Sequence, residues 1–421
     1  MAERRDGDTR GHGLDRQRPA ATGRLLLRFR HAMGARERFQ LLSNALGEET
    51  ARGAIDPAAV DASPTEAAGP DCSASMLLGR LDLAVVGTGE GFANGSAMHR
   101  LLNEEGVRSV RPEFFLFQSS LALAPPVADT AEATWGIAAT GAAESPFTGR
   151  GIRLAVLDTG IDLEHPDFAG REIVSRSFVE GEGVDDVQGH GTHCAGTAAG
   201  AMLAGGRTRY GVAPDVLLHV GKVLNDRGAG REGDILAGMI WAVEAGCEVV
   251  SMSLGRTVRI GEERTPEYEE AGAYALERGS LILAAAGNDS RREYGFVAPV
   301  GEPANAPSIL AVAALDPRLA VAPFSNGGLE GSGGEVDLAA PGVGVFSTVP
   351  MPRRYASFDG TSMACPHAAG IAALWAESDA SLRGAALAER LRGAALPLDL
   401  EPADAGAGLV AAPVESALPV A

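Results

Sequence analysis

Five apolar segments, separated by stretches with helical character, constrain the fold of this 421-residue chain more than any other feature. A strand that is buried on both faces reads as a continuous apolar run, so this alternation predicts a parallel sheet covered by helices on both faces. The predicted strands are residues 152–157, 216–224, 249–254, 281–286 and 309–315. The predicted helices are residues 192–203, 232–246 and 267–279. The expected fold class is α/β, a three-layer sandwich with a mostly parallel central sheet.

Three residues lie just past the ends of predicted strands, namely Asp158, Gly255 and Asn288. Open α/β sheets bind their ligands at the carboxyl ends of the strands. The sequence therefore predicts a functional site at this edge, with a carboxylate in the turn Asp158-Thr159-Gly160.

Ser362 opens an apolar, helix-like run that follows Gly360. A serine at a helix N-terminus lies among backbone N–H groups, and the positive end of the helix dipole favours developing negative charge. Pro366 suits the first helical turn, where no N–H is needed. This pattern alone fits a nucleophile, but it equally fits an ordinary N-cap serine.

His190 supplies what a serine nucleophile lacks, since it stands at the start of a small-residue helix in His-Gly-Thr-His. Serine attacks only when a base takes its proton, and the base needs a carboxylate that fixes its tautomer. Along the chain these groups follow the order Asp158, His190, Ser362. That order differs from those of the chymotrypsin and α/β-hydrolase types.

Residues 135–377 resemble the subtilisin-like serine proteases, that is, peptidase family S8 or the subtilases. Asp-Thr-Gly, His-Gly-Thr-His and Gly-Thr-Ser-Met-Ala-x-Pro-His all stand here in the order of that family. The resemblance implies a serine endopeptidase that acts through an acyl-enzyme intermediate. It gives Asp158 the orienting role, His190 the general-base role and Ser362 the nucleophile role.

The same resemblance implies an oxyanion-hole amide at Asn288, acting with the backbone N–H of Ser362. It also implies substrate-binding positions at Ser253, Leu254, Gly255, Gly228, Ala229, Gly230, Gly287 and Gly301. A surface turn is the alternative interpretation of Gly228 and Gly230. Asp289 and Glu302 lie near the expected specificity pocket, which suggests a preference for Lys or Arg at the cleaved position.

The composition of the chain indicates which classes of partner are not expected. Lys and Arg number 36 against 55 Asp and Glu, a formal net charge of -19, which argues against nucleic acid as a partner. No run of 18 apolar residues occurs, so no membrane span is expected. The polar segment 1–8 is not followed by an apolar one, so a standard secretory signal is not expected. A cytoplasmic location is favoured, with secretion as the alternative.

The four cysteines are too few and too scattered for a disulfide framework, and they show no zinc-ligand spacing. They are Cys72, Cys194, Cys247 and Cys365, and we expect reduced, mostly buried thiols. A cysteine at the position of Cys194 resembles the proteinase K branch of the family, in which this thiol lines the site without being the nucleophile.

The pattern of apolar and helical segments in residues 24–120 predicts a separate small unit. Strands are expected at residues 25–30, 81–86 and 107–117, helices at 35–46 and 96–105, and a loop at 50–75. This α+β pattern resembles the inhibitory propeptide of the family, and an unrelated accessory domain is the alternative. The unit would then be an intramolecular inhibitor, removed by cleavage between Phe117 and Trp135.

The expected domain organisation has five parts. They are a disordered tail (1–23), the propeptide-like inhibitor or chaperone domain (24–120), a linker (121–134), the peptidase domain (135–398) and a C-terminal tail (399–421).

No cofactor is expected for the chemistry. Structural calcium is possible by family resemblance, but the loop 201–210 contains no Asp, Asn or Glu. A calcium site needs six or more oxygen ligands, and Asp167 alone matches one ligand position of the family. The usual strong calcium site therefore looks absent, and Asp185 and Asp186 are interpreted as a solvated acidic loop.

The function predicted from the sequence is a serine endopeptidase that acts on protein or peptide substrates. Two alternatives remain. One is a narrow processing protease for a single peptide partner, and the other is a catalytically silent scaffold that binds peptides.

Overall fold

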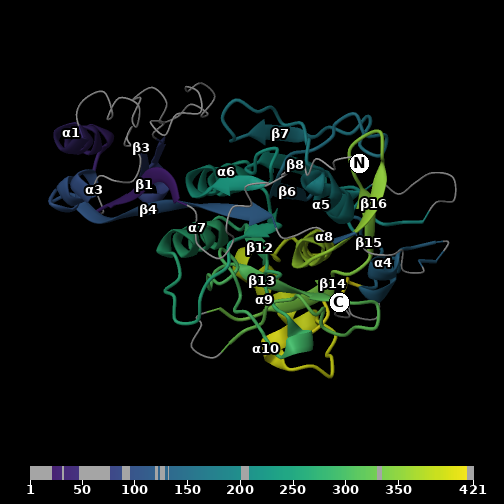
Figure 1. Cartoon of the computed structure of the whole chain (residues 1–421). Coiled ribbons are helices and arrows are strands. Elements are labelled where there is room, and N and C mark those ends of the chain that lie inside the picture. The colour runs from purple at the N-terminus through teal and green to yellow at the C-terminus, as the bar shows by residue number, and fades with distance from the viewer. Residues whose placement is uncertain are drawn as a thin grey trace, which may run out of the picture.

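The computed structural model of the chain contains two units that pack against each other (Figure 1). The N-terminal unit comprises residues 21–118, and the large unit comprises residues 129–414. The described residues are 21–30, 33–46, 76–87, 95–118, 122–123, 129–130, 132–200, 208–329 and 334–414. Residues 1–20 of the predicted tail 1–23, the predicted loop 50–75 and Cys72 lie outside them. The prediction of a disordered tail is wrong for residues 21–23, which begin strand β1 (Ala21–Phe29).

The large unit is built on a seven-stranded sheet with the order β14-β13-β12-β10-β6-β8-β7, in which every neighbouring pair is parallel. Its strands are β6 (Arg153–Asp158), β7 (Val174–Ser177), β8 (Leu217–Lys222), β10 (Val249–Met252), β12 (Leu281–Ala285), β13 (Leu310–Leu315) and β14 (Leu338–Pro341). The predicted parallel α/β sheet is confirmed. The two edge strands β7 and β14 escaped prediction because they are short, and β7 (Val-Ser-Arg-Ser) has no apolar run.

Helices cover both faces of this sheet, and the side-chain alternation along β6 shows why. Leu154 and Val156 belong to the core beneath α5 (His190–Ala199) and α8 (Thr361–Ser378). Ala155 and Leu157 point the other way, into the core beneath α6 (Glu232–Glu244) and α7 (Pro266–Glu277). Because successive strand residues face opposite sides, a run without polar residues fits a strand between two helical layers.

Shorter elements complete the large unit. They are α4 (Trp135–Ala139), β9 (Ala229–Arg231), β11 (Leu254–Gly255), η2 (Arg292–Tyr294), β15 (Val345–Thr348), β16 (Tyr355–Asp359), α9 (Gly384–Ala394) and α10 (Pro402–Ala405). The chain that joins the two units contributes β5 (Ala122–Leu123).

The N-terminal unit is an antiparallel sheet with two helices on one face. Its sheet order is β4-β1-β3-β2, and its elements are β1 (Ala21–Phe29), α1 (Ala35–Leu46), β2 (Met76–Leu78), η1 (Gly79–Leu81), β3 (Leu83–Gly87), α3 (Gly95–Leu102) and β4 (Val107–Gln118). Leu25 and Leu27 of β1 pack in a core of this unit's own. Leu26 and Val85 face the other way, into the core shared with the large unit. One face of the small sheet is therefore buried against the large unit.

The C-terminal segment packs on the large unit as far as Val414, beyond the boundary expected at 398. Leu409 and Val410 are buried, and Val410 N donates to Ala339 O of β14 at 2.9 Å. The expected tail 399–421 is therefore wrong for residues 399–414, because these apolar side chains extend the core at the edge of the sheet.

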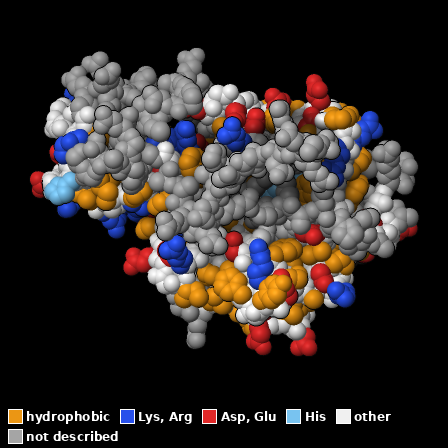
Figure 2. Space-filling view, viewed as in Figure 1, with side chains coloured by type: hydrophobic (Ala, Val, Ile, Leu, Met, Phe, Trp, Pro, Cys, Tyr) orange, Lys and Arg blue, Asp and Glu red, His pale blue; other side chains and the backbone are white. Residues whose placement is uncertain are grey.

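The surface carries both signs of charge. In the view of Figure 2, acidic and basic side chains are scattered over both units. Within the part of the chain that the structure describes, no helix is long and apolar enough to cross a membrane.

Candidate active site

A buried carboxylate–imidazole pair lies at the carboxyl edge of the parallel sheet. Asp158 ends β6 and His190 begins α5, and His190 Nδ1 lies 2.7 Å from Asp158 Oδ1 with both side chains fully buried. The close approach of α5 to the end of β6 requires a glycine after the histidine. A Cβ added at Gly191 would lie only 2.3 Å from Gly160 O.

Asp186 holds α5 in this place. Its two carboxylate oxygens accept four hydrogen bonds, from Thr159 Oγ1 (2.8 Å), Gly189 N (2.7 Å), Thr192 N (2.7 Å) and Thr192 Oγ1 (2.7 Å). It thus satisfies free N–H groups at the helix start and ties them to the end of β6. The interpretation of Asp186 as part of a solvated loop is wrong, because its side chain is buried. An Asp just before a helix start was the signal that could have found it.

Ser362 is the second residue of α8 and is 1% exposed. Its Oγ donates to Ser253 O at 3.2 Å. Pro366 lies in the second turn of α8, not in the first as predicted, and its missing N–H leaves the carbonyl of Ser362 without the usual helical partner. That carbonyl accepts instead from Ser253 Oγ at 2.7 Å and from Cys194 Sγ at 3.5 Å.

Cys194 shows that the imidazole and the start of α8 are neighbours. Its Sγ lies 3.8 Å from His190 Nδ1 and 3.5 Å from Ser362 O. Burial raises the pKa of this thiol well above 9.0, so it stays protonated. The other nitrogen of His190, Nε2, is buried without a hydrogen-bond partner and can accept a proton.

Two N–H donors face one small space beside Ser362. The side-chain oxygen of Asn288 accepts from Thr361 N and Thr361 Oγ1, both at 2.9 Å, so its Nδ2 is turned away and has no partner. A Cβ added at Gly360 would lie 3.1 Å from Asn288 Nδ2 and 3.5 Å from Ser362 N. The glycine therefore leaves open a space that both donors border, and such a space suits an oxyanion.

Electrostatics favour the protonated imidazole. Burial lowers the pKa of His190, but the Asp158 carboxylate at hydrogen-bond distance and the nearby Asp186 outweigh burial and raise it above the usual 6.5. The His190 ring is therefore a stronger base than a free histidine.

A strand of the N-terminal unit, β4, pairs with both β9 and β11, and the place that it takes between these two strands is called the groove below. Leu116 and Phe117 of β4 pair with Gly230 and Ala229 of β9, and Phe117 and Gln118 pair with β11 (Leu254–Gly255). Both pairings are antiparallel, so β4 forms the middle strand of three. Four of the predicted substrate-binding residues, Ala229, Gly230, Leu254 and Gly255, are thus the residues that flank this strand.

The remaining predicted substrate-binding residues border the same region in different ways. Gly228 lies in the turn before β9, where its N donates to Asn225 O at 2.7 Å. Gly301 N donates to Ala286 O at 2.9 Å, and Gly287 directly precedes Asn288.

The chain continues on the far side of the site. Ala122 and Leu123 of β5 pair with Asp359 and Phe358 of β16, the strand that leads into Gly360 and α8. The chain therefore pairs with the large unit both at Phe117–Gln118 and at Ala122–Leu123.

Glu302 and Asp289 do not form a free acidic pocket. Glu302 is fully buried, pairs with Arg256 Nε at 2.8 Å and accepts from Thr265 N at 2.8 Å. Asp289 is exposed and accepts from Thr257 Oγ1 at 2.9 Å. The sequence predicted that Asp289 and Glu302 favour Lys or Arg at the cleaved position. For Glu302 this is not supported, because Arg256 already neutralises its carboxylate.

Asp167 does not fit a calcium ligand among the described residues. Tyr210 Oη donates to its Oδ2 at 2.5 Å, and Tyr355 Oη lies 2.9 Å from Oδ2 and 3.1 Å from Oδ1. Burial and the bond to Asp167 raise the pKa of Tyr210, so its hydroxyl keeps its proton. Two neutral hydroxyls thus satisfy the carboxylate that a cation would otherwise hold.

A serine beside a buried Asp–His pair and an oxyanion space defines a serine-hydrolase type of site. Residues 149–408 match the model of the Subtilase family, and the chain belongs to that family of serine-type endopeptidases.

The intracellular serine protease of Paenibacillus polymyxa is 41% identical over 231 residues, which is 54% of this chain and 67% of that protein. Subtilisin DY of Bacillus licheniformis is 38% identical over 253 residues, 60% of this chain and 86% of the relative. The major intracellular serine protease of Bacillus subtilis is 38% identical over 236 residues, which is 54% of this chain and 68% of that protein.

Replacing Asp186 by Asn is expected to destabilise the protein by about 1–3 kcal/mol, because an amide cannot accept all four hydrogen bonds and leaves buried donors unsatisfied. Thermal unfolding in a Ser362→Ala background, which prevents self-digestion, measures the change. Asp185→Asn is the matched control, since Asp185 is exposed and the charge change is the same. Equal melting temperatures for the two variants would contradict the role given to Asp186.

Proposed function

We propose that this chain hydrolyses peptide bonds with Ser362 as nucleophile, His190 as general base and Asp158 as the group that orients His190. The observation that carries the proposal is the fully buried bond between Asp158 and His190 Nδ1, which leaves Nε2 unpartnered in a ring that shares the neighbour Cys194 with Ser362. A histidine held in this tautomer can take a proton from a serine.

The reaction follows from these positions. A rotation about the Cα–Cβ bond of Ser362 frees Oγ from Ser253 O, and Oγ then attacks the substrate carbonyl carbon while its proton passes to His190 Nε2. Asn288 Nδ2 and Ser362 N donate to the resulting oxyanion. His190 gives the proton to the leaving amine, which breaks the C–N bond and leaves an acyl-enzyme ester. Water repeats the attack with His190 as base and restores Ser362.

We also propose that the N-terminal unit is an intramolecular inhibitor that the enzyme cuts off. The support is the pairing of β4 on one side of Ser362 and of β5 on the other, because an extended peptide substrate adds a strand in this way. Gln118 pairs with Leu254, the residue that follows Ser253, whose carbonyl contacts Ser362 Oγ. The bond that is cut then lies between Gln118 and Ala122, within the range predicted from the sequence.

We propose an intracellular place of action. Two relatives are named as intracellular serine proteases, and each matches more than half of this chain. Fractionation of the source cells followed by detection with an antibody tests this, and accumulation of the protein in the medium would contradict it.

Purified wild-type protein is expected to lose its N-terminal unit, because β4 and β5 pair with β11 and β16, the strands next to Ser253 and to the start of α8. Intact mass of the purified protein measures this, with Ser362→Ala beside it as control. The wild type should begin at a residue between 119 and 122, and the variant should stay whole. A full-length wild type would refute self-cleavage, and an equal cut in Ser362→Ala would assign the cut to another protease.

The rate should fall at acidic pH with a midpoint above 6.5, because only neutral His190 can accept the proton and its pKa is raised. Peptide hydrolysis by the processed enzyme at a series of pH values, expressed as kcat/KM, measures the midpoint. Asp158→Asn removes the neighbouring charge that most raises the pKa of His190. The variant should therefore be much slower, and the midpoint of its pH profile should lie at lower pH than that of the wild type. A wild-type midpoint below 6.5 would contradict this electrostatic account.

Excess EDTA should leave the melting temperature unchanged, because two tyrosine hydroxyls satisfy Asp167 in place of a cation. Thermal unfolding of Ser362→Ala with EDTA and with added calcium makes the comparison. A lower melting temperature in EDTA, restored by calcium, would overturn this view.

A further inference from the structure

Three carboxylates of the large unit form a buried acidic cluster at the starts of two helices. Glu232 and Asp234 lie in the first turn of α6, and Glu267 lies in the first turn of α7. Their exposed fractions are 0%, 8% and 3%, and all three face the N-terminal unit. With the N-terminal unit in place, carboxylates this buried need cationic partners, and that unit supplies them.

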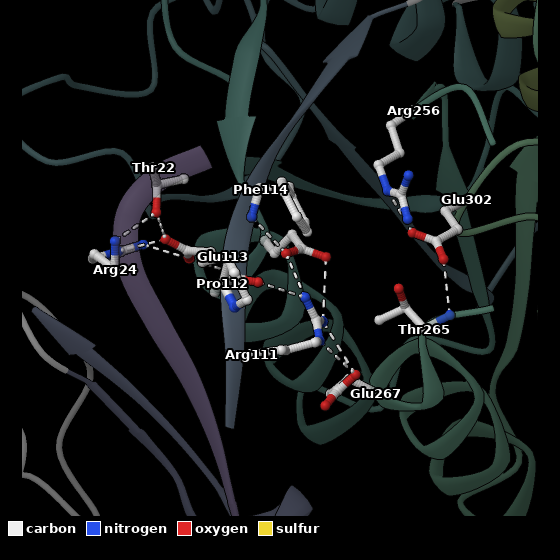
Figure 3. A network of polar contacts seen from close by, with 12 residues as sticks. Thr22, Arg24, Arg111, Pro112, Glu113, Phe114, Arg256, Thr265, Glu267 and Glu302 are labelled. Carbon is white, nitrogen blue, oxygen red and sulfur yellow. Dashed lines mark hydrogen bonds and ion pairs between the residues drawn. The ribbon is translucent and has the colours of Figure 1, made fainter. Parts of the chain in front are cut away.

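The guanidinium of Arg111, from β4, pairs with two of these carboxylates, Glu232 and Glu267, and Figure 3 shows its contact with Glu267. Arg111 Nη1 is 3.0 Å from Glu232 Oε2, and Nη2 is 3.1 Å from Glu267 Oε2 and 3.4 Å from Glu232 Oε1. Nε adds a contact of 3.3 Å to Glu267 Oε2. Several N–H groups of one planar fork are thus used at once, which a lysine could not reproduce.

The same cluster contacts the backbone of the strand that enters the groove. Phe114 N donates to Glu232 Oε2 at 2.7 Å, and the Phe114 ring lies 5.6 Å from the guanidinium of Arg256. Two residues further on, Leu116 is fully buried and pairs with Gly230. Arg111, Phe114 and Leu116 therefore belong to one extended segment, β4, whose end pairs with β9 and β11 near Ser362.

We propose that Glu232 and Glu267 select peptide substrates that carry an arginine upstream of the cleaved bond, at the place that Arg111 has relative to the residues of β4 that pair with β9 and β11. The inference rests on the proposed function, in which the N-terminal unit leaves and β4 vacates the groove. The cluster then stays on the large unit without its internal guanidinium, and an arginine-bearing peptide restores the pairing.

The preference belongs to a site distant from the cleaved bond. Arg24 and Arg28, the other basic partners of the cluster, come from β1 and not from the strand in the groove. A substrate can therefore replace only the contact made by Arg111, and the selection concerns a single arginine at one position.

Synthetic peptides that span residues 107–123 test the proposal without any need for a folded variant. The processed wild-type enzyme is given the native peptide, an Arg111→Gln peptide and an Arg108→Gln peptide, and kcat/KM is measured for each. Arg108 is exposed, so the third peptide matches the charge change at a neighbouring place. We expect Arg111→Gln to lower kcat/KM about tenfold or more and Arg108→Gln to change it less than twofold.

The outcomes separate the two proposals. Equal kcat/KM for all three peptides would overturn the arginine selection and leave the peptidase function standing, since the peptides are cut. Equal losses for the two arginine substitutions would also overturn it, because the effect would then be one of overall charge. Hydrolysis of none of the peptides would overturn the proposed function and this inference with it.

A variant of the enzyme identifies the carboxylate. Glu267→Gln should lower kcat/KM for the native peptide and abolish the difference between native and Arg111→Gln peptides, whereas exposed Glu263→Gln should preserve that difference. A difference that persists in Glu267→Gln would contradict the assignment to Glu267.

Discussion

The buried bond between Asp158 and His190 is the interaction on which the site depends. It joins the end of β6 to the start of α5, and neither side chain reaches solvent. A carboxylate in such a place is stable only with hydrogen-bonding partners, and it receives His190 Nδ1 and Thr159 N. This arrangement fixes the tautomer of His190 and raises its pKa, so one contact sets both the geometry and the basicity of the ring.

The surroundings of this pair explain several residues that have no chemical role of their own. Asp186 accepts hydrogen bonds from the start of α5. Gly191 has no side chain, and this lets α5 approach the end of β6 closely. Lys222, at the end of β8 and fully buried, donates to Thr159 O at 2.7 Å and so holds the residue after Asp158. Pro366 frees the carbonyl of Ser362 for Ser253 and Cys194. Backbone and side chain thus combine to hold the start of α8 beside the imidazole.

Much of the fold followed from the sequence because its signals are local. The apolar runs predicted all five central strands, and the carboxyl-edge rule placed Asp158 and Asn288 correctly at the ends of β6 and β12. Other features depend on contacts between distant segments. The burial of Asp186, the pairing of Glu302 with Arg256, and the tyrosines on Asp167 all join residues far apart in sequence. For Glu302 no local pattern distinguishes the buried acid from a solvated one, so its partner Arg256 was not expected, whereas the position of Asp186 just before a helix start is a local signal.

Labelling with a fluorophosphonate probe tests most directly whether Ser362 is an activated nucleophile. The account predicts that purified wild-type protein reacts at Ser362 on a fragment that lacks the N-terminal unit, while Ser362→Ala and His190→Ala do not react. If full-length wild type is still present, it should react only after limited proteolysis removes β4 from the groove. Wild-type protein that stays unlabelled both before and after proteolysis would contradict the account.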